Sequence, residues 1–106
     1  MDIGKLKDYS DQAHDLAQTK KNALEKMRSR QIMAYNGRLF RADADTINAV
    51  QTYKNYQKEF YMLDINDNPC HVKEPDEFLK TLVERNQESL NTYHQLHEDL
   101  KNKRLR

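Results

Sequence analysis

An Asn-Gly pair in the stretch YNGRLFRADADT, residues 35–46, interrupts a chain that otherwise reads as helix. Asn36 and Gly37 lie between two short apolar flanks, and a type I′ turn needs positive φ at both central residues. Gly37 is one of two glycines in the chain, which indicates that the backbone geometry requires it there. We therefore predict a β-hairpin over residues 32–40 that turns at Asn36 and Gly37.

The residues before this turn follow a helical pattern. Apolar side chains recur at steps of three and four from about residue 3 to residue 30, which places them on one helix face. They are Leu6, Tyr9, Ala13, Leu16, Ala23 and Met27. Lys20 and Arg30 fall in the same seam, where a charge weakens a coiled coil but fixes its register. The pattern fits a coiled-coil-like helix or an amphipathic helix packed on its own domain.

A middle helix and a second hairpin are predicted after the first turn. Asp43 or Asp45 can cap the helix, because a carboxylate accepts hydrogen bonds from its free N–H groups. Its apolar stripe includes two tyrosines, Tyr53 and Tyr56. Residues 60–72 then read as a hairpin, because turn-forming residues separate an apolar segment from a short apolar return.

The last predicted helix begins at Pro75, a residue that suits the first turn of a helix, and runs to about Lys101. Its heptad positions hold Leu79, Leu82, Asn86, Tyr93, Leu96 and Leu100. A buried amide at such a position specifies register at some cost in stability. Asn86 is therefore expected in a helical seam.

The composition favours a slender fold. Of the 106 residues, 37% are hydrophobic and 33% are charged, yet the net charge is only +1. Disordered chains combine low hydrophobicity with high net charge, and the second condition is not met. We predict an elongated α+β fold, mostly α, with two long amphipathic helices, a middle helix and two short β-hairpins. Residues 1–31 would form the N-terminal helix, and residues 32–106 a helix-hairpin domain that ends in the long C-terminal helix.

A chain of this length and shape hides little apolar surface by itself. We therefore expect an oligomer or a multicopy subunit of a larger assembly, with partners docked on the helical seams and aromatic stripe. The candidate interface residues are Leu6, Leu16, Met27, Tyr53, Tyr56, Leu79, Leu82, Asn86, Tyr93, Leu96 and Leu100.

No pattern in the chain points to catalysis. The lone Cys70 excludes an internal disulfide and fits a reducing compartment. His71 is adjacent, but neighbours in an extended segment point to opposite faces. The carboxylates are spread over helical faces, and two glycines 33 positions apart cannot make a phosphate loop. We predict a protein that is not an enzyme and binds no cofactor.

The motif DINDN resembles the start of a calcium loop. Asp64, Asn66 and Asn68 copy the first three ligand positions. Pro69 lies where that loop needs glycine, and Pro75 lies where a bidentate glutamate should close it. A polar hairpin turn is the better interpretation.

Two histidines on the last predicted helix are the other candidate metal ligands. His94 and His97 are three residues apart, and Glu98 follows. Zinc needs a further protein ligand, which His14 or His71 would have to supply from elsewhere. Histidines in solvent or at an interface are the preferred interpretation, and no metal is predicted.

Basic side chains near both ends raise the possibility of nucleic-acid binding with a steep salt dependence. They are Lys20, Lys21, Lys26, Arg28, Arg30, Lys101, Lys103, Arg104 and Arg106. The near-neutral total charge argues against it, since dedicated binders are plainly basic. No run of residues has the apolar core of a signal peptide or reaches membrane-spanning length. We expect a soluble protein made in the cytoplasm.

Two stretches, MRSRQIMAYNGRLFRADADT and DNPCHVKEPDEFLKTL, resemble a family of small bacteriophage domains of unknown function. These domains occur inside, or are encoded beside, tail-fibre and tail-fibre-assembly proteins. The matching residues are Arg30, Gly37, Phe40, Asp43 and Thr46 in the first stretch and Asp67, Asn68, Val72, Phe78 and Leu82 in the second. The resemblance covers roughly residues 27–102. The chain lacks the family's tryptophan before the Asp-Asn pair, where Tyr61 and Leu63 are nearby.

The resemblance implies a structural or assembly role in a phage particle and offers no catalytic residues. We expect a non-enzymatic adaptor of the virion tail, baseplate or tail-fibre attachment region, made in the host cytoplasm. A tail-fibre assembly chaperone absent from the mature virion is the first alternative. A nucleic-acid or host-factor binding protein is the second.

Overall fold

The computed structural model describes the backbone of residues 3–104 and the side chains of residues 13–102. Within this part of the chain it confirms the predicted α+β fold, with three helices and two antiparallel hairpins. In chain order the elements are α1 (Ile3–Arg30), β1 (Ile32–Tyr35), β2 (Arg38–Arg41), α2 (Ala44–Tyr56), β3 (Phe60–Leu63), β4 (Pro69–Val72) and α3 (Pro75–Arg104).

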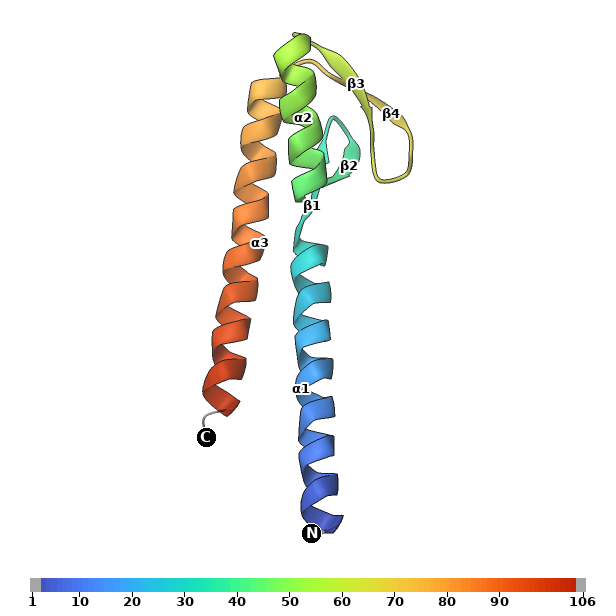
Figure 1. Cartoon of the computed structure of the whole chain (residues 1–106). Coiled ribbons are helices and arrows are strands. Elements are labelled where there is room, and N and C mark those ends of the chain that lie inside the picture. Colours follow the sequence, from blue (N-terminus) through green and yellow to red (C-terminus); the bar gives the residue numbers. More distant parts are fainter. Residues whose placement is uncertain (1–2, 105–106) are drawn as a thin grey trace.

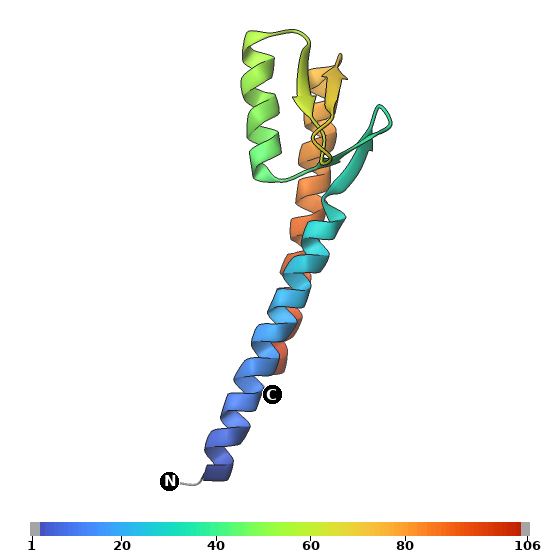
Figure 2. The same cartoon turned by 90° about the vertical axis from the view of Figure 1, so that its right-hand side faces the viewer.

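The molecule is a rod of 66 × 24 × 23 Å. Its radius of gyration is 19.6 Å, whereas a compact chain of this length would have about 13 Å. α1 and the second half of α3 run antiparallel side by side and form the stem, which we define as α1 with residues 85–104 (Figure 1). α2 and both hairpins gather around the first half of α3 and form the head, residues 31–84 (Figure 2).

The first hairpin turns where the Asn-Gly pair predicts. β1 and β2 pair antiparallel, with Tyr35 opposite Arg38. Asn36 has a φ of 50° and Gly37 a φ of 73°, so both central residues adopt the left-handed conformation of a type I′ turn. The predicted structural role of these two residues is confirmed.

Gly37→Ala is expected to lower the free energy of unfolding by about 1 kcal/mol, because an L side chain is strained at positive φ. A Cβ at Gly37 would meet no heavy atom within 4 Å, so the effect comes from the backbone and not from a clash. Gly37→Asn is the matched control and should lose less than half as much, since asparagine tolerates this conformation. Urea denaturation measures both; equal losses would contradict the explanation.

Asp43 is the cap of α2. Its Oδ1 accepts a hydrogen bond from the Thr46 backbone N–H at 2.9 Å, while Asp45 lies in the first turn of the helix. Of the two candidates from the sequence, Asp43 therefore satisfies the free N–H, and Asp45 adds negative charge at the positive end of the helix dipole.

The second hairpin pairs β3 with β4, with Tyr61 opposite His71. The two hairpins belong to separate sheets. They are joined by a backbone hydrogen bond from the Ile65 N–H to the Leu39 carbonyl at 3.0 Å. α3 begins at Pro75, as predicted, and ends at Arg104, slightly beyond the predicted end at Lys101.

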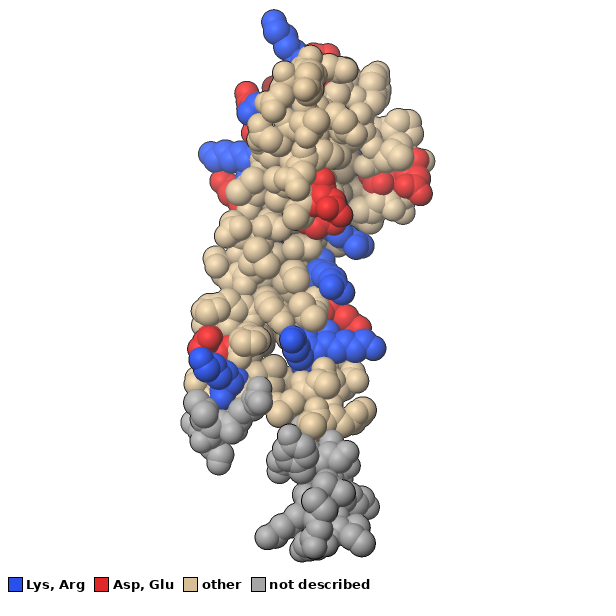
Figure 3. All heavy atoms as spheres, viewed as in Figure 1, with Lys and Arg blue, Asp and Glu red and all other residues tan. Residues whose placement is uncertain are grey.

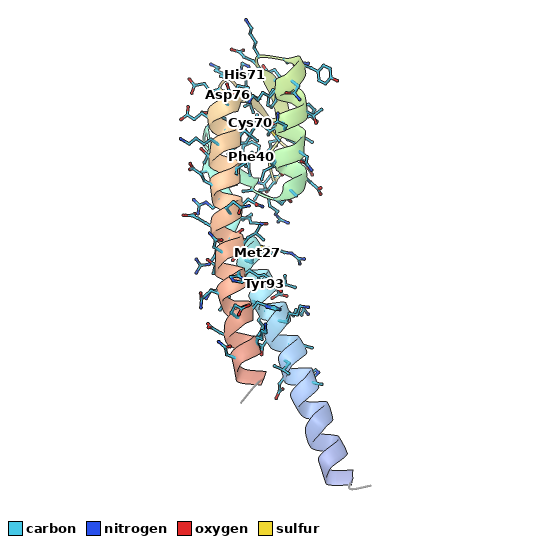
Figure 4. The ribbon with its side chains drawn as sticks, turned by 60° about the vertical axis from the view of Figure 1, so that its left-hand side comes forward. Met27, Phe40, Cys70, His71, Asp76 and Tyr93 are labelled. Atoms are coloured by element: carbon cyan, nitrogen blue, oxygen red, sulfur yellow. The ribbon has the colours of Figure 1, made fainter. Side chains whose placement is uncertain are left out.

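The hydrophobic core lies in the head. Its fully buried side chains come from β2, α2, β4 and α3, and the largest are Phe40, Val50, Val72, Phe78 and Leu82. The rings of Phe40 and Phe78 pack edge to face with centroids 5.0 Å apart. Figure 4 shows Phe40 between α2 and α3. The first half of α3 therefore completes a core that the middle of the chain begins.

Candidate interaction surface

Five of the predicted interface residues lie along the stem. Leu16 and Met27 of α1 and Tyr93, Leu96 and Leu100 of α3 are all half-buried. Figure 4 shows Met27 beside Tyr93 where the two helices run together. The outer helices pair within one chain, so these side chains are partly covered by their own molecule. The side chain of Leu6, a sixth candidate on α1, lies outside the described residues.

Three other candidates serve the head of this chain. Leu82 is fully buried in the core, and Leu79 packs against it. Asn86 is half-buried, and its Nδ2 donates a hydrogen bond to the Ala42 carbonyl at 3.0 Å. The Asn86 amide therefore fixes α3 against the segment between β2 and α2. Leu82 is hidden in the core, whereas Leu79 and Asn86 are half-buried and make their contacts within the head.

The last two candidates, Tyr53 and Tyr56 of α2, are on the surface of the head. Tyr56 is 85% exposed and Tyr53 is 44% exposed. Beside Tyr53 lies an open groove of about 350 Å³, lined by Ala49, Tyr53, Tyr61, Met62, Leu63 and Pro69. Apolar and aromatic side chains are thus available to a neighbouring molecule at the head as well as along the stem.

The Asp64 carboxylate organises the DINDN turn by binding backbone N–H groups of that turn. It accepts hydrogen bonds from the N–H groups of Asn66 at 2.8 Å and Asn68 at 2.9 Å. Arg38 Nη1 lies 3.6 Å from its other oxygen. The hydrogen bond from Asn68 lowers the pKa of Asp64, helped by Asn66 and Arg38 and opposed by burial. The motif is a polar turn that ties the second hairpin to Arg38 of the first.

Asp64→Asn is expected to lower the urea midpoint at neutral pH. Because the folded-state pKa of Asp64 is lowered, the carboxylate stabilises the fold above its unfolded pKa of about 3.9. That contribution is lost as the pH falls through the folded-state pKa. The difference between variant and wild type should therefore shrink as the pH falls below about 3.9. Glu84→Gln removes an exposed carboxylate from α3 and serves as the control. A difference that stays constant with pH would contradict the role given to Asp64.

The other titratable candidates lie apart. Residues 13–102 contain no group of three or more His, Cys, Asp or Glu side chains that could hold a metal ion. His94 and His97 are both exposed on α3. Cys70 is buried, and desolvation raises the pKa of its thiol; Arg38 lowers it to a smaller extent, and the Asp64 charge raises it. The thiol packs in the core of the head.

Two buried polar side chains that the sequence analysis did not single out join the stem to the head. Gln31 and Ser89 are 6% and 0% exposed, and Gln31 Nε2 donates to Ser89 Oγ at 3.2 Å. Ser89 Oγ donates in turn to the Asn86 carbonyl at 2.7 Å. Ser89 stands three residues after Asn86 and four before Tyr93, so the heptad spacing contained the signal for its burial.

A second contact that the sequence analysis did not predict lies on the outer face of the second hairpin. The Tyr61 and His71 rings stack with centroids 4.8 Å apart and planes 18° from parallel. His71 Nε2 lies 3.1 Å from a Glu59 carboxylate oxygen. Only the strand register brings these residues together, and that register is not apparent from the separate segments of the sequence.

Comparison with known proteins adds no further assignment. No family model matches the chain, and neither a curated protein sequence nor a solved structure matches it. The described helices include none with enough length and apolar character to cross a membrane. The resemblance to phage tail-fibre-associated domains remains a prediction from the sequence.

Proposed function

We propose that this chain is a non-enzymatic structural adaptor that joins neighbouring proteins in a larger assembly. One observation carries the proposal: the molecule is a rod whose apolar seam and aromatic side chains are only partly covered by its own fold. The seam residues of the stem are half-buried. On the head, Tyr56, Tyr61 and Leu63 are 85%, 69% and 58% exposed. Such side chains are covered when neighbouring subunits pack against them.

The assembly we propose is the tail of a bacteriophage particle, at the baseplate or the tail-fibre attachment region. The sequence resemblance over roughly residues 27–102 supports this setting. Several of its motif residues are structural in the head: Gly37 forms the turn, Asp43 caps α2, and Phe40 and Phe78 fill the core. Residues of this kind, shared with the phage domains, would maintain the same fold in the head.

An adaptor of this shape would act by burying apolar surface against its partners and by holding those partners at a fixed distance. The 66 Å length of the rod separates the surface of the head from the free end of the stem, so two partners can be held apart. In a tail, copies of the adaptor would follow the cyclic symmetry of the baseplate or fibre. The chain would therefore be a multicopy component of the virion.

Quantitative mass spectrometry of purified virions tests this function. The chain is expected in mature particles at a fixed ratio to a baseplate or fibre protein. Its absence from mature particles would remove the virion role. Recovery from infected cells in complex with unassembled fibre chains, together with absence from virions, would instead support the assembly chaperone.

A nucleic-acid binding role is the other candidate with a specific observation in its favour. Between residues 16 and 30, α1 carries five basic side chains and one acidic side chain. Phosphate contacts by such a helix predict an affinity that falls steeply as salt is added. Fluorescence anisotropy with labelled DNA and RNA decides the point, and no binding at low salt would exclude this role.

A further inference from the structure

The stem carries a groove with an apolar floor along one flank of the α1–α3 seam. The groove has a volume of about 460 Å³ and is lined by Leu16, Ala17, Lys20, His97, Glu98, Leu100 and Lys101. Its floor is formed by Leu16 and Ala17 from α1 and Leu100 from α3. Both helices of the stem thus contribute to one surface.

The same flank continues toward the head. Residues seven apart lie on the same side of a helix, so Leu24 extends the line of Ala17 along α1. On α3, Leu90 extends the line of His97 in the same way and is 40% exposed. We call this surface the stem groove; it follows α3 from Leu90 to Lys101, about 17 Å at 1.5 Å per residue. A helix of about 11 residues covers this length.

The opposite flank of the seam carries a smaller groove. It has a volume of about 290 Å³ and is lined by Thr19, Asn22, Ala23, Lys26, Leu96, Asp99 and Leu100. The stem groove exposes more apolar surface than this one, so covering the stem groove gains more free energy.

The rim of the stem groove is basic. Lys20 and Lys101 line it, together with the single acidic side chain Glu98. Arg28 lies one helical turn beyond Leu24, on the same flank of α1. The ion pairs found among residues 13–102 all lie in the head, so no carboxylate is within ion-pair distance of these cations in the described part of the stem. In Figure 3 an uncharged strip runs along the stem, with basic and acidic side chains on either side of it.

The positive charge of the rim indicates which kind of partner fits the stem groove. Two copies placed groove to groove would bring basic rims together, and like charges at an interface suppress pairing. Acidic side chains at the edges of an apolar stripe would match the rim and steer association. Helices that dock in apolar grooves present such stripes at positions i, i+3 or i+4, and i+7.

We propose that the stem groove binds one acidic amphipathic helix of a partner protein and so forms a three-helix bundle with α1 and α3. The inference rests on the proposed adaptor function and names the chemistry of its partner. Leu24, Leu90 and Leu100 pack against the apolar stripe of the incoming helix. Lys20, Arg28 and Lys101 pair with its flanking carboxylates.

Two synthetic peptides of about 18 residues, long enough to form a helix in isolation, test the proposal. Both carry the same leucine stripe; one has glutamate on both flanks and the other has lysine. Fluorescence anisotropy with the full chain should show at least tenfold tighter binding of the glutamate peptide. Equal affinities, or no binding of the glutamate peptide, would overturn the proposal.

Variants of the full chain locate the site. Leu90→Asp should weaken binding of the glutamate peptide at least tenfold, and Lys20→Glu combined with Lys101→Glu should reverse the preference between the peptides. Lys58→Glu changes an exposed charge on the head and is the matched control, with affinity unchanged. Circular dichroism verifies that each variant keeps its helix content; since Leu90 is partly exposed, that condition is expected to hold.

Two further outcomes would also reject the proposal. In sedimentation experiments on the chain alone, concentration-dependent dimers that Leu90→Asp abolishes would identify a second copy as the occupant. Displacement of the glutamate peptide by duplex DNA would identify a phosphate-binding surface. These measurements are independent of virion composition, so a failed peptide test and absence from particles reject different statements.

Discussion

Phe78→Ala is expected to lower the free energy of unfolding by about 3–5 kcal/mol, the usual loss for a buried phenylalanine. Phe78 is fully buried, and its ring lies 4.4 Å from that of Tyr35 and 5.0 Å from that of Phe40, between centroids. Removing it leaves a cavity at the meeting point of the first hairpin and α3. A domain of this size has a total stability of about 5–15 kcal/mol, so a large part of the head's stability depends on this ring.

Thermal and urea denaturation followed by circular dichroism measure the effect. Tyr56→Ala removes a comparable ring from an 85% exposed position on α2 and should change stability by no more than about 0.5 kcal/mol. A Phe78→Ala variant that stays within about 1 kcal/mol of the wild type would show that the core does not depend on this contact.

Ala23→Asp is expected to separate the two helices of the stem while the head stays folded. Ala23 is 8% exposed between α1 and α3, where α3 contributes the half-buried Leu96 and Leu100. A carboxylate there would lose hydration without gaining a partner, which costs about 2 kcal/mol or more. Because the stem has a narrow apolar seam and the head has the core, the loss should be local.

Amide hydrogen exchange resolves the two parts. Exchange in residues 13–30 of α1 should accelerate at least tenfold, while amides of β2 and the first half of α3 keep their protection. Ala17→Asp makes the same substitution at an exposed position of the same helix and should leave exchange nearly unchanged. Uniform acceleration through stem and head would mean that the two parts unfold as one unit.

The local structure was readable from the sequence wherever one residue type has a steric or hydrogen-bonding reason for its position. Asn36 and Gly37 have the positive φ values of a type I′ turn, Asp43 accepts the hydrogen bond of a cap, and Pro75 begins α3. Each of these signals depends on a few neighbouring residues, so no knowledge of distant contacts was needed.

The element that covers each heptad residue of α3 could not be predicted in the same way. Along α3 the spacing of Leu82, Asn86, Tyr93 and Leu96 is regular, yet Leu82 and Asn86 face the head and Tyr93 and Leu96 face α1. A periodic stripe states which face of a helix is apolar and not which element covers it. The pairing of the outer helices within one chain therefore came only from the structure.

The aromatic stripe of α2 shows the same limit on the candidate surface. Val50 is fully buried, whereas Tyr56, six residues later, is 85% exposed. Both belong to the apolar stripe by spacing, but α2 extends past the core before the chain turns into β3. Exposure at the end of a helix depends on where its neighbours end, which a single segment does not encode.

One helix completes both parts of the molecule, and this has a consequence for synthesis of the chain. The head needs Phe78 and Leu82 for its core, and the stem needs Tyr93, Leu96 and Leu100 opposite α1. A ribosome-bound chain that has not yet released α3 therefore holds two short hairpins and two unpaired amphipathic helices, none of which is stable alone. Folding must wait until α3 has left the ribosome, and until then these apolar surfaces are exposed to chaperones and proteases.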